Sequence, residues 1–150
     1  SGLKAVETLA RKCNVSLTAA AIRYAQRTPD PIAIVISEEN KILYCFMSSE
    51  LQDIEELSWI KKNSLLSKNT ITFHFNQTPQ NILNCKRDEG SSTLLDWFQC
   101  LKEYELYEEV IGLGKYGKTL TVLSIESIPD QDEIDEEEEL EDSWAIKFKR

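Results

Sequence analysis

Residues 9–27 read LARKCNVSLTAAAIRYAQR and predict two helices joined by a tight turn. Ser16 is a favourable N-cap for the second helix. The apolar residues of the first helix recur at steps of three and four, as on one helical face: Leu3, Val6, Leu9, Ala10 and Cys13. The second helix carries one such stripe, and Ala19 and Ile22 fall on its opposite side. We therefore expect its outer face to meet either a sheet domain or a neighbouring domain.

The segment that follows, residues 28–37, reads TPDPIAIVIS and predicts the first strand of a sheet. Proline disfavours helical geometry at the residue before it, so Pro29 and Pro31 end the helix. The continuous apolar run at residues 32–37 is typical of a strand covered on both faces. A polar turn then leads to residues 41–47, KILYCFM, which predict the partner strand of a hairpin.

The middle of the chain changes to a helical pattern. Residue 49 is a good N-cap for a helix that would carry Leu51, Ile54, Leu57, Trp59 and Ile60. Residues 71–75, ITFHF, fit a helix or a strand equally well, and residues 93–98, TLLDWF, are equally ambiguous. The polar residues 86–92 predict a loop. Two further strands are expected at residues 106–111 and 118–125.

This order of elements predicts an α+β fold, in which an N-terminal helical hairpin precedes a PAS/GAF-like antiparallel sheet with inserted helices. The expected units are a helix-turn-helix-like hairpin at residues 1–28, a PAS/GAF-like α+β domain at residues 29–126, and an acidic, disordered tail at residues 127–150.

The net charge of −9 belongs to the tail, because residues 130–142 hold ten carboxylates in thirteen positions. Outside that run, 17 basic residues face the remaining 16 acidic ones. Such a run is typically solvated. No apolar run approaches the ~20 residues of a membrane span, so we expect a cytoplasmic protein without membrane contact.

No catalytic constellation can be assembled from the sequence. His74 is the single histidine and has no partner at metal-ligand spacing. The four cysteines show no CxxC spacing, which favours reduced thiols that pack as small hydrophobes: Cys13, Cys45, Cys85 and Cys100. The segment GLGKYG (residues 112–117) lacks the full phosphate-loop pattern and is better interpreted as a hairpin turn.

The residue types bear on two binding functions. The opening hairpin resembles a DNA-binding helix-turn-helix. DNA binding normally recruits about six or more phosphate contacts, whereas the hairpin has five basic residues and they do not share one face. DNA binding is therefore not expected. Several aromatic and apolar side chains could instead line a small-molecule pocket or an interface, or simply fill the core: Tyr44, Phe46, Trp59, Phe73, Phe75, Trp97 and Ile22.

Two blocks of sequence carry a family resemblance. LARKCNVSLTAAAIRYAQRTPDPIAIVIS resembles the segment after the catalytic helices of ImmA/IrrE-type zinc metallopeptidases. LLDWF followed by LYEEVIGLGKYGKTLTVLSI is similar to the C-terminal block of that family, with its Trp-Phe pair, acidic strand residue, Tyr-Gly and closing leucine-threonine strand. The resemblance covers most of residues 3–125, and the middle is only loosely matched.

The family's zinc ligands are a HExxH helix and a downstream acidic residue, and both precede the segment matched here. This chain contains no HExxH, so no catalytic residue is carried over. The resemblance implies a noncatalytic C-terminal regulatory or binding domain of a cytosolic metallopeptidase that cleaves a transcriptional repressor, with zinc only in the preceding catalytic part. Expected partners are that catalytic domain and a repressor protein or small ligand. A PAS/GAF-like ligand sensor and a domain that dimerises through the opening helices remain the alternatives.

Overall fold

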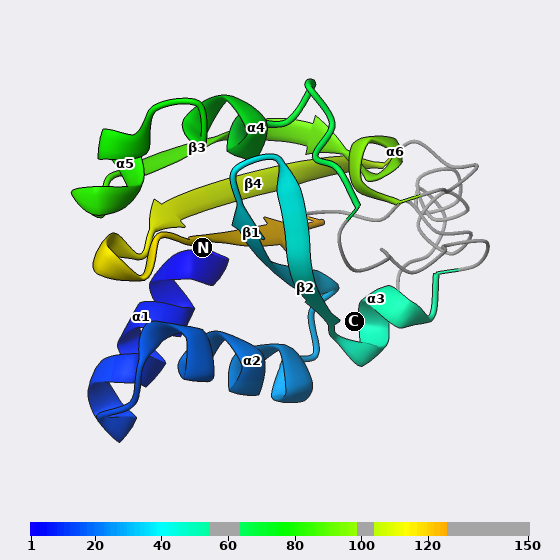
Figure 1. Ribbon diagram of the computed structural model, residues 1–150. Helices are drawn as coiled ribbons and strands as arrows, with labels where there is room; N and C mark the ends of the chain where they lie inside the picture. The colour runs from blue at the N-terminus through cyan, green and yellow to red at the C-terminus, as the bar shows by residue number, and fades with distance from the viewer. Residues whose placement is uncertain (55–63, 99–103, 126–150) are drawn as a thin grey trace.

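The computed structural model describes residues 1–54, 64–98 and 104–125. Two N-terminal helices precede a five-stranded, fully antiparallel sheet of order β2-β1-β5-β4-β3, and further helices are inserted between the second and third strands (Figure 1). The predicted α+β fold is therefore confirmed. The helices are α1 (Gly2–Cys13), α2 (Leu17–Arg27), α3 (Ser49–Gln52), α4 (Ile71–Phe75), α5 (Pro79–Leu83) and α6 (Leu94–Trp97). The strands are β1 (Ile32–Glu38), β2 (Lys41–Met47), β3 (Arg87–Thr93), β4 (Glu105–Gly112) and β5 (Thr119–Ser124).

The helical hairpin forms where the sequence predicts it. Asn14 ends α1 in the left-handed conformation, with φ 55°, which asparagine tolerates better than most residues. The Ser16 side chain then accepts a hydrogen bond of 3.1 Å from the Ala19 amide and caps α2. The two helices cover one face of the sheet, here called the hairpin face, and share a core with it: Leu3, Val6, Ala20, Ala21, Ala25, Ile32, Ile34, Ile36, Ile111, Leu120 and Val122.

The opposite face, here called the inserted-helix face, carries a second apolar core. It includes residues from α3, α6 and the segment before α4: Ala33, Val35, Ile42, Met47, Leu51, Leu66, Leu94, Trp97, Phe98, Leu106, Leu123 and Ile125. Because β1 lies inside the sheet and both faces are covered, all six residues from 32 to 37 are buried. This confirms the interpretation of that run as a doubly covered strand.

The prediction of a loop at residues 86–92 is wrong, because these residues form most of β3. This strand lies at the edge of the sheet and pairs only with β4, with Gly90 opposite Glu108. Most of its side chains are exposed, and charged or polar residues are a common way for an edge strand to avoid pairing with another chain. Its polarity therefore reflects an edge position rather than the absence of a strand.

The two ambiguous segments are resolved as short helices. Residues 71–75 form α4 and residues 94–97 form α6, and Pro79 occupies the first turn of α5, where its missing N–H costs no helical hydrogen bond. Of the helix expected from residue 49, the described part is α3; Leu57, Trp59 and Ile60 lie outside the described residues, as does the predicted tail beyond residue 125. No helix in the described ranges is long and apolar enough to cross a membrane.

Candidate functional site

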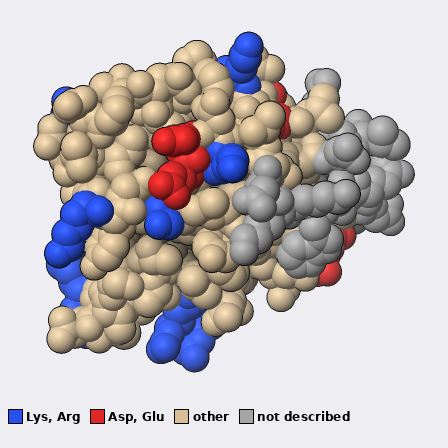
Figure 2. Space-filling view, in the orientation of Figure 1, with Lys and Arg blue, Asp and Glu red and all other residues tan. Residues whose placement is uncertain are grey.

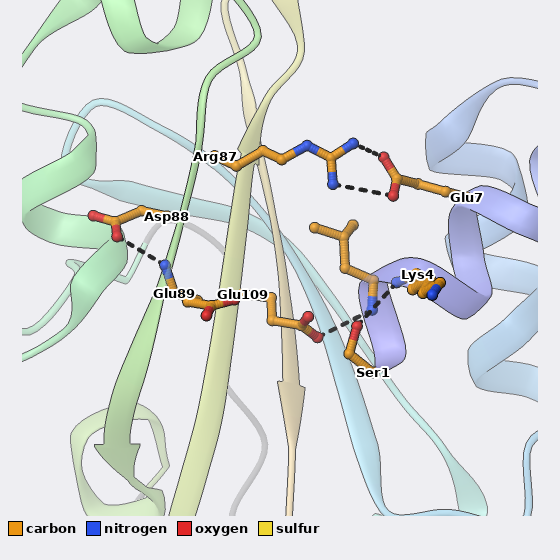
Figure 3. A pocket seen from close by; sticks show the side chains of 8 residues that line it. Ser1, Lys4, Glu7, Arg87, Asp88, Glu89 and Glu109 are labelled. Carbon is orange, nitrogen blue, oxygen red and sulfur yellow. Dashed lines mark hydrogen bonds and ion pairs between the residues drawn. The ribbon is translucent and has the colours of Figure 1, made fainter.

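A groove lies between the first two turns of α1 and the β4–β3 side of the sheet (Figure 3). Its volume is about 580 Å³. Six of its eight lining residues are charged: Ser1, Leu3, Lys4, Glu7, Arg87, Asp88, Glu89 and Glu109. Ligand pockets for small molecules are mostly apolar, whereas this lining is mostly charged.

The floor of the groove is built by the start of α1 resting on the sheet. Oε1 of the buried Glu109 accepts a hydrogen bond of 3.0 Å from the Leu3 amide. A carboxylate is favourable there because the first N–H groups of a helix lack intrahelical partners and carry partial positive charge. Gly2 lies so close to β5 that a Cβ on it would stand 2.7 Å from Val122 Cγ1. These contacts fix where the hairpin begins.

The rim of the groove is formed by the ion pair between Arg87 and Glu7, which lie 80 residues apart in the sequence. Arg87 donates from Nη1 to Glu7 Oε1 at 3.1 Å and from Nη2 to Glu7 Oε2, which joins the edge strand to α1. The Arg87 side chain is 55% exposed. The Glu7 side chain is 20% exposed. Surface pairs contribute only about 0–1 kcal/mol.

Two carboxylates of the edge strand accept hydrogen bonds at the groove. The Glu89 amide donates to Asp88 Oδ1 at 2.8 Å, and the Tyr107 hydroxyl donates to Glu89 Oε1 at 2.7 Å. The N–H of Glu89 is thus satisfied within its own strand, which makes addition of another β-strand at this point less favourable.

The sequence-predicted site residues are divided between the two faces of the sheet. Tyr44 and Phe46 belong to β2, and their rings stack on each other with centroids 6.4 Å apart. Tyr44 is 48% exposed, and Phe46 packs against the hairpin-face core. Ile22 is half-buried on α2. Phe73 and Trp97 belong to the inserted-helix face.

The two remaining aromatic candidates lie elsewhere. Phe75 is buried in a small cluster with Ile82 and Val110. Trp59 lies outside the described residues. The structure therefore brings Tyr44 together with Phe46, and separates this pair from the aromatic residues of the opposite face.

Beneath α4, the inserted-helix face carries a buried polar network. Glu108 is fully buried and accepts hydrogen bonds from the amides of Ile71 (3.0 Å) and Thr72 (2.6 Å) and from the Thr72 hydroxyl. The Thr72 hydroxyl also lies 2.8 Å from that of Thr121 on β5. Buried polar groups of this kind are costly unless they are paired, and here each has a partner.

The second part of the network is centred on Asn76, at the end of α4. Its amide donates to Ser37 Oγ at 3.1 Å and to the Glu39 carbonyl at 3.0 Å, and its Oδ1 accepts from Thr119 at 2.6 Å. This network fixes the position of α4 on the sheet.

The cysteines and the histidine occupy separate places. Cys45 is half-buried and packs against the inserted-helix core, where burial raises the pKa of its thiol from 9.0 to about 12. Cys13 and Cys85 are exposed, so the expectation that they pack as small hydrophobes is wrong. Cys13 lies in the last turn of α1, and Cys85 stands in a turn with φ 51°. His74 is exposed, with Nε2 3.0 Å from the Lys68 carbonyl oxygen.

Residues 112–117 connect β4 to β5 through a short 3₁₀ helix, Gly114–Tyr116. Gly114 and Gly117 have φ values of 69° and 72°, a region that glycine enters without steric cost. The turn interpretation of this glycine-bearing segment is confirmed. Within the described ranges, no group of three or more His, Cys, Asp or Glu residues could hold a metal ion.

No protein-family model matches the chain, and no curated protein matches it either.

Sequence reasoning missed the groove, although one signal for it was visible. Glu108 and Glu109 interrupt the otherwise apolar strand LYEEVIG, and two adjacent carboxylates in a buried strand must each find a donor. The pairing of Glu7 with Arg87 left no such signal, because 80 residues separate them.

Proposed function

We propose that this chain is a noncatalytic regulatory module that acts by binding protein, of the kind expected after the zinc-binding segment of ImmA/IrrE-type metallopeptidases. The observation that carries the proposal is the charged groove at the start of α1, whose floor is fixed by the hydrogen bond from the Leu3 amide to Glu109. A domain joined ahead of α1 would meet the sheet at this groove.

The charges of the groove suit a protein partner. Glu7 and Arg87 neutralise each other, while Lys4, Asp88 and Glu89 are exposed around them. Arg87 is 55% exposed within this pair, so a partner with charges of both signs can reach it and form pairs of its own. Complementary charge of this type determines orientation and specificity more than affinity.

The packing on the other sheet face supports protein binding over the PAS/GAF-like ligand-sensing alternative. Trp97 and Phe98 fill the apolar core there, and the polar network around Glu108 and Asn76 fills the space under α4. A ligand would have to displace side chains that already satisfy one another.

The surface of the hairpin also disfavours the third hypothesis, dimerisation through the opening helices. Leu3, Val6 and Ala21 are buried against the sheet, so the apolar residues that could drive helix pairing are already used. Obligate dimer interfaces are enriched in apolar area, and the outer side of α1 and α2 carries exposed basic side chains instead.

The proposal is tested with the region encoded immediately upstream. If that region holds a HExxH segment, it is expressed as a separate chain and titrated calorimetrically with residues 1–150. We expect binding that Arg87→Glu weakens by about tenfold, the cost of about 1.4 kcal/mol for a lost charge contact. The double variant Glu7→Arg with Arg87→Glu keeps the ion pair of the free chain but reverses its direction, so it should also bind weakly.

Lys115→Glu provides the matched control, because it makes the same change of charge at an exposed site on the turn between β4 and β5, away from the groove. Binding unaffected by Arg87→Glu would refute the groove as the docking surface. An upstream region without a HExxH segment would refute the family assignment.

A further inference from the structure

The groove beside α1 carries an excess of negative charge. Its charged lining residues are Lys4, Glu7, Arg87, Asp88, Glu89 and Glu109. Arg87 pairs with Glu7, which leaves three carboxylates against Lys4. The Lys4 side chain is exposed and forms no ion pair with any residue in the ranges that the structure describes. On the face of the molecule seen in Figure 2, by contrast, basic side chains lie in several separate places. The charge of the groove therefore favours a cationic ligand.

Two of these carboxylates stand directly opposite each other. Glu89 on β3 is in register with Glu109 on β4, so both side chains lie on the same face of the sheet, toward α1 (Figure 3). Directly opposite residues of an antiparallel pair have Cβ atoms about 4.5–5.5 Å apart, and like charges at this spacing are destabilising. A cation bound by both carboxylates would relieve that repulsion.

Each carboxylate of this pair has one oxygen engaged and one oxygen left for a ligand. Glu109 is only 5% exposed, and its Oε1 accepts from the Leu3 amide at 3.0 Å. Glu89 is exposed, and its Oε1 accepts from the Tyr107 hydroxyl at 2.7 Å. Within residues 1–54, 64–98 and 104–125, neither Oε2 accepts a hydrogen bond. A buried polar group is costly unless it is paired, and Glu109 lines the groove, so a ligand in the groove can supply the donor that its Oε2 lacks.

This pair of acceptors suits a guanidinium better than an ammonium ion. A guanidinium presents its N–H donors in a planar fork that matches carboxylate oxygens, and it is more weakly hydrated than an ammonium ion, which favours it at a partly buried site. The same groove already contains one such contact, because Arg87 donates from both Nη atoms to the two carboxylate oxygens of Glu7.

We propose that Glu89 and Glu109 bind the guanidinium of an arginine side chain that the protein partner presents to the groove. This inference rests on the proposed function, because it names the group by which the partner docks. The two Oε2 atoms accept N–H groups of the fork, while the Leu3 amide and the Tyr107 hydroxyl hold the carboxylates in place. Binding replaces repulsion between like charges by charge-assisted hydrogen bonds.

The site is tested by NMR titration of the ¹⁵N-labelled chain, residues 1–150, with Nα-acetyl-arginine N-methylamide at low ionic strength. We expect saturable shifts of the Leu3, Glu89 and Glu109 amide signals. Leu3 is the most direct reporter, because its N–H donates to Glu109. The citrulline analogue, in which a neutral urea replaces the guanidinium, should cause no saturable shifts, and the lysine analogue should bind several-fold more weakly.

Glu89→Gln removes one charge of the pair at an exposed position, so the fold should be retained. The dissociation constant of the arginine analogue should rise several-fold in this variant. Glu50→Gln is the matched control, because it makes the same change at an exposed position of α3, away from the groove. Binding to Glu50→Gln should equal binding to the unmodified protein.

The proposal is overturned if the arginine analogue causes no saturable shifts, if the citrulline or lysine analogue binds equally well, or if Glu89→Gln leaves binding unchanged. These failures differ from failure of the proposed function. If the upstream domain binds residues 1–150 calorimetrically with an affinity that Glu89→Gln does not alter, the protein-binding function stands and the arginine site is refuted. If the arginine analogue binds and the upstream domain does not, the proposed function is refuted and the arginine site stands.

Discussion

Glu108 and Glu109 are adjacent on β4, and their carboxylates hold helices on opposite faces of the sheet. Glu109 accepts from the Leu3 amide at the start of α1, at 3.0 Å. Glu108 accepts from the Ile71 amide at the start of α4, at 3.0 Å, and from Thr72. Successive strand residues point to opposite faces, so this one dipeptide connects the groove on the hairpin face to the polar network under α4.

Replacing Glu108 by glutamine should destabilise the fold. The amide group keeps the shape but turns one acceptor into a donor that faces backbone N–H groups, and hydrogen bonds to a charged group are each worth about 1.5–3 kcal/mol. We expect a loss of about 2 kcal/mol in the free energy of unfolding, measured by urea denaturation. Glu105→Gln, at an exposed position of the same strand, should stay within about 0.5 kcal/mol of the unmodified protein.

Gly112→Ala tests the close packing of α5 on the end of β4. A Cβ at this buried position would stand 2.6 Å from the Asn81 carbonyl oxygen and 2.6 Å from Ile82 Cα. Both are backbone atoms and cannot move aside alone, so we expect a loss of about 1–3 kcal/mol in unfolding free energy. Gly117→Asn is the contrast, because a Cβ there meets nothing within 4 Å and asparagine tolerates a φ of 72°. Similar losses for both variants would contradict the packing described.

The cysteines should differ sharply in reactivity. Thiolates react and thiols do not, and burial holds the pKa of Cys45 at about 12. Alkylation at pH 8, followed by peptide mass spectrometry, should modify Cys13 and Cys85, which are exposed, and leave Cys45 unmodified until the protein is unfolded. Rapid modification of Cys45 in the native protein would show that its thiol is not buried.

The same thiol makes the free energy of unfolding fall at alkaline pH. The folded-state pKa of Cys45 is raised above its ordinary value of 9.0. The contribution of the protonated thiol to the free energy of unfolding is therefore complete below pH 9 and is lost as the pH rises towards 12. In Cys45→Ala, unfolding free energy should fall less steeply between pH 9 and pH 12 than in the unmodified protein. An identical slope in both proteins would mean that the thiol does not contribute.

The ion pair at the groove should matter little for stability. Arg87→Ala removes a pair in which the arginine side chain is 55% exposed, so the free energy of unfolding should change by less than about 1 kcal/mol. A thermal melt checks this before any binding assay. A much larger loss would mean that Arg87 has a structural role, and the binding variants at this position would then be uninformative.

The sequence predicted those elements whose pattern is determined locally. Ser16 and the apolar spacing of α2 specify a capped helix, and the run at residues 32–37 specifies a strand covered on both sides. The edge strand β3 could not be recognised in this way. Four of the seven residues of β3 are exposed and the strand has no apolar alternation, and its pairing with β4 is visible only when the sheet is assembled.

The groove was still less accessible to sequence reasoning. It depends on Glu7 meeting Arg87, and on Gly2 approaching Val122. These contacts are set by how the hairpin packs on the sheet, and tertiary packing of this kind leaves no periodic signal. The aromatic residues chosen from the sequence were the natural candidates for a pocket, but hydrophobicity alone does not say which sheet face a side chain will occupy.

The measurement that tests the central claim most directly is the zinc content of the purified chain. The protein is produced in zinc-supplemented medium, dialysed against metal-free buffer and analysed by elemental analysis with the protein concentration measured in parallel. A noncatalytic binding module should retain far less than one zinc ion per chain. One tightly held zinc ion per chain would contradict the account, because it would place a metal centre in a region assigned here to protein binding.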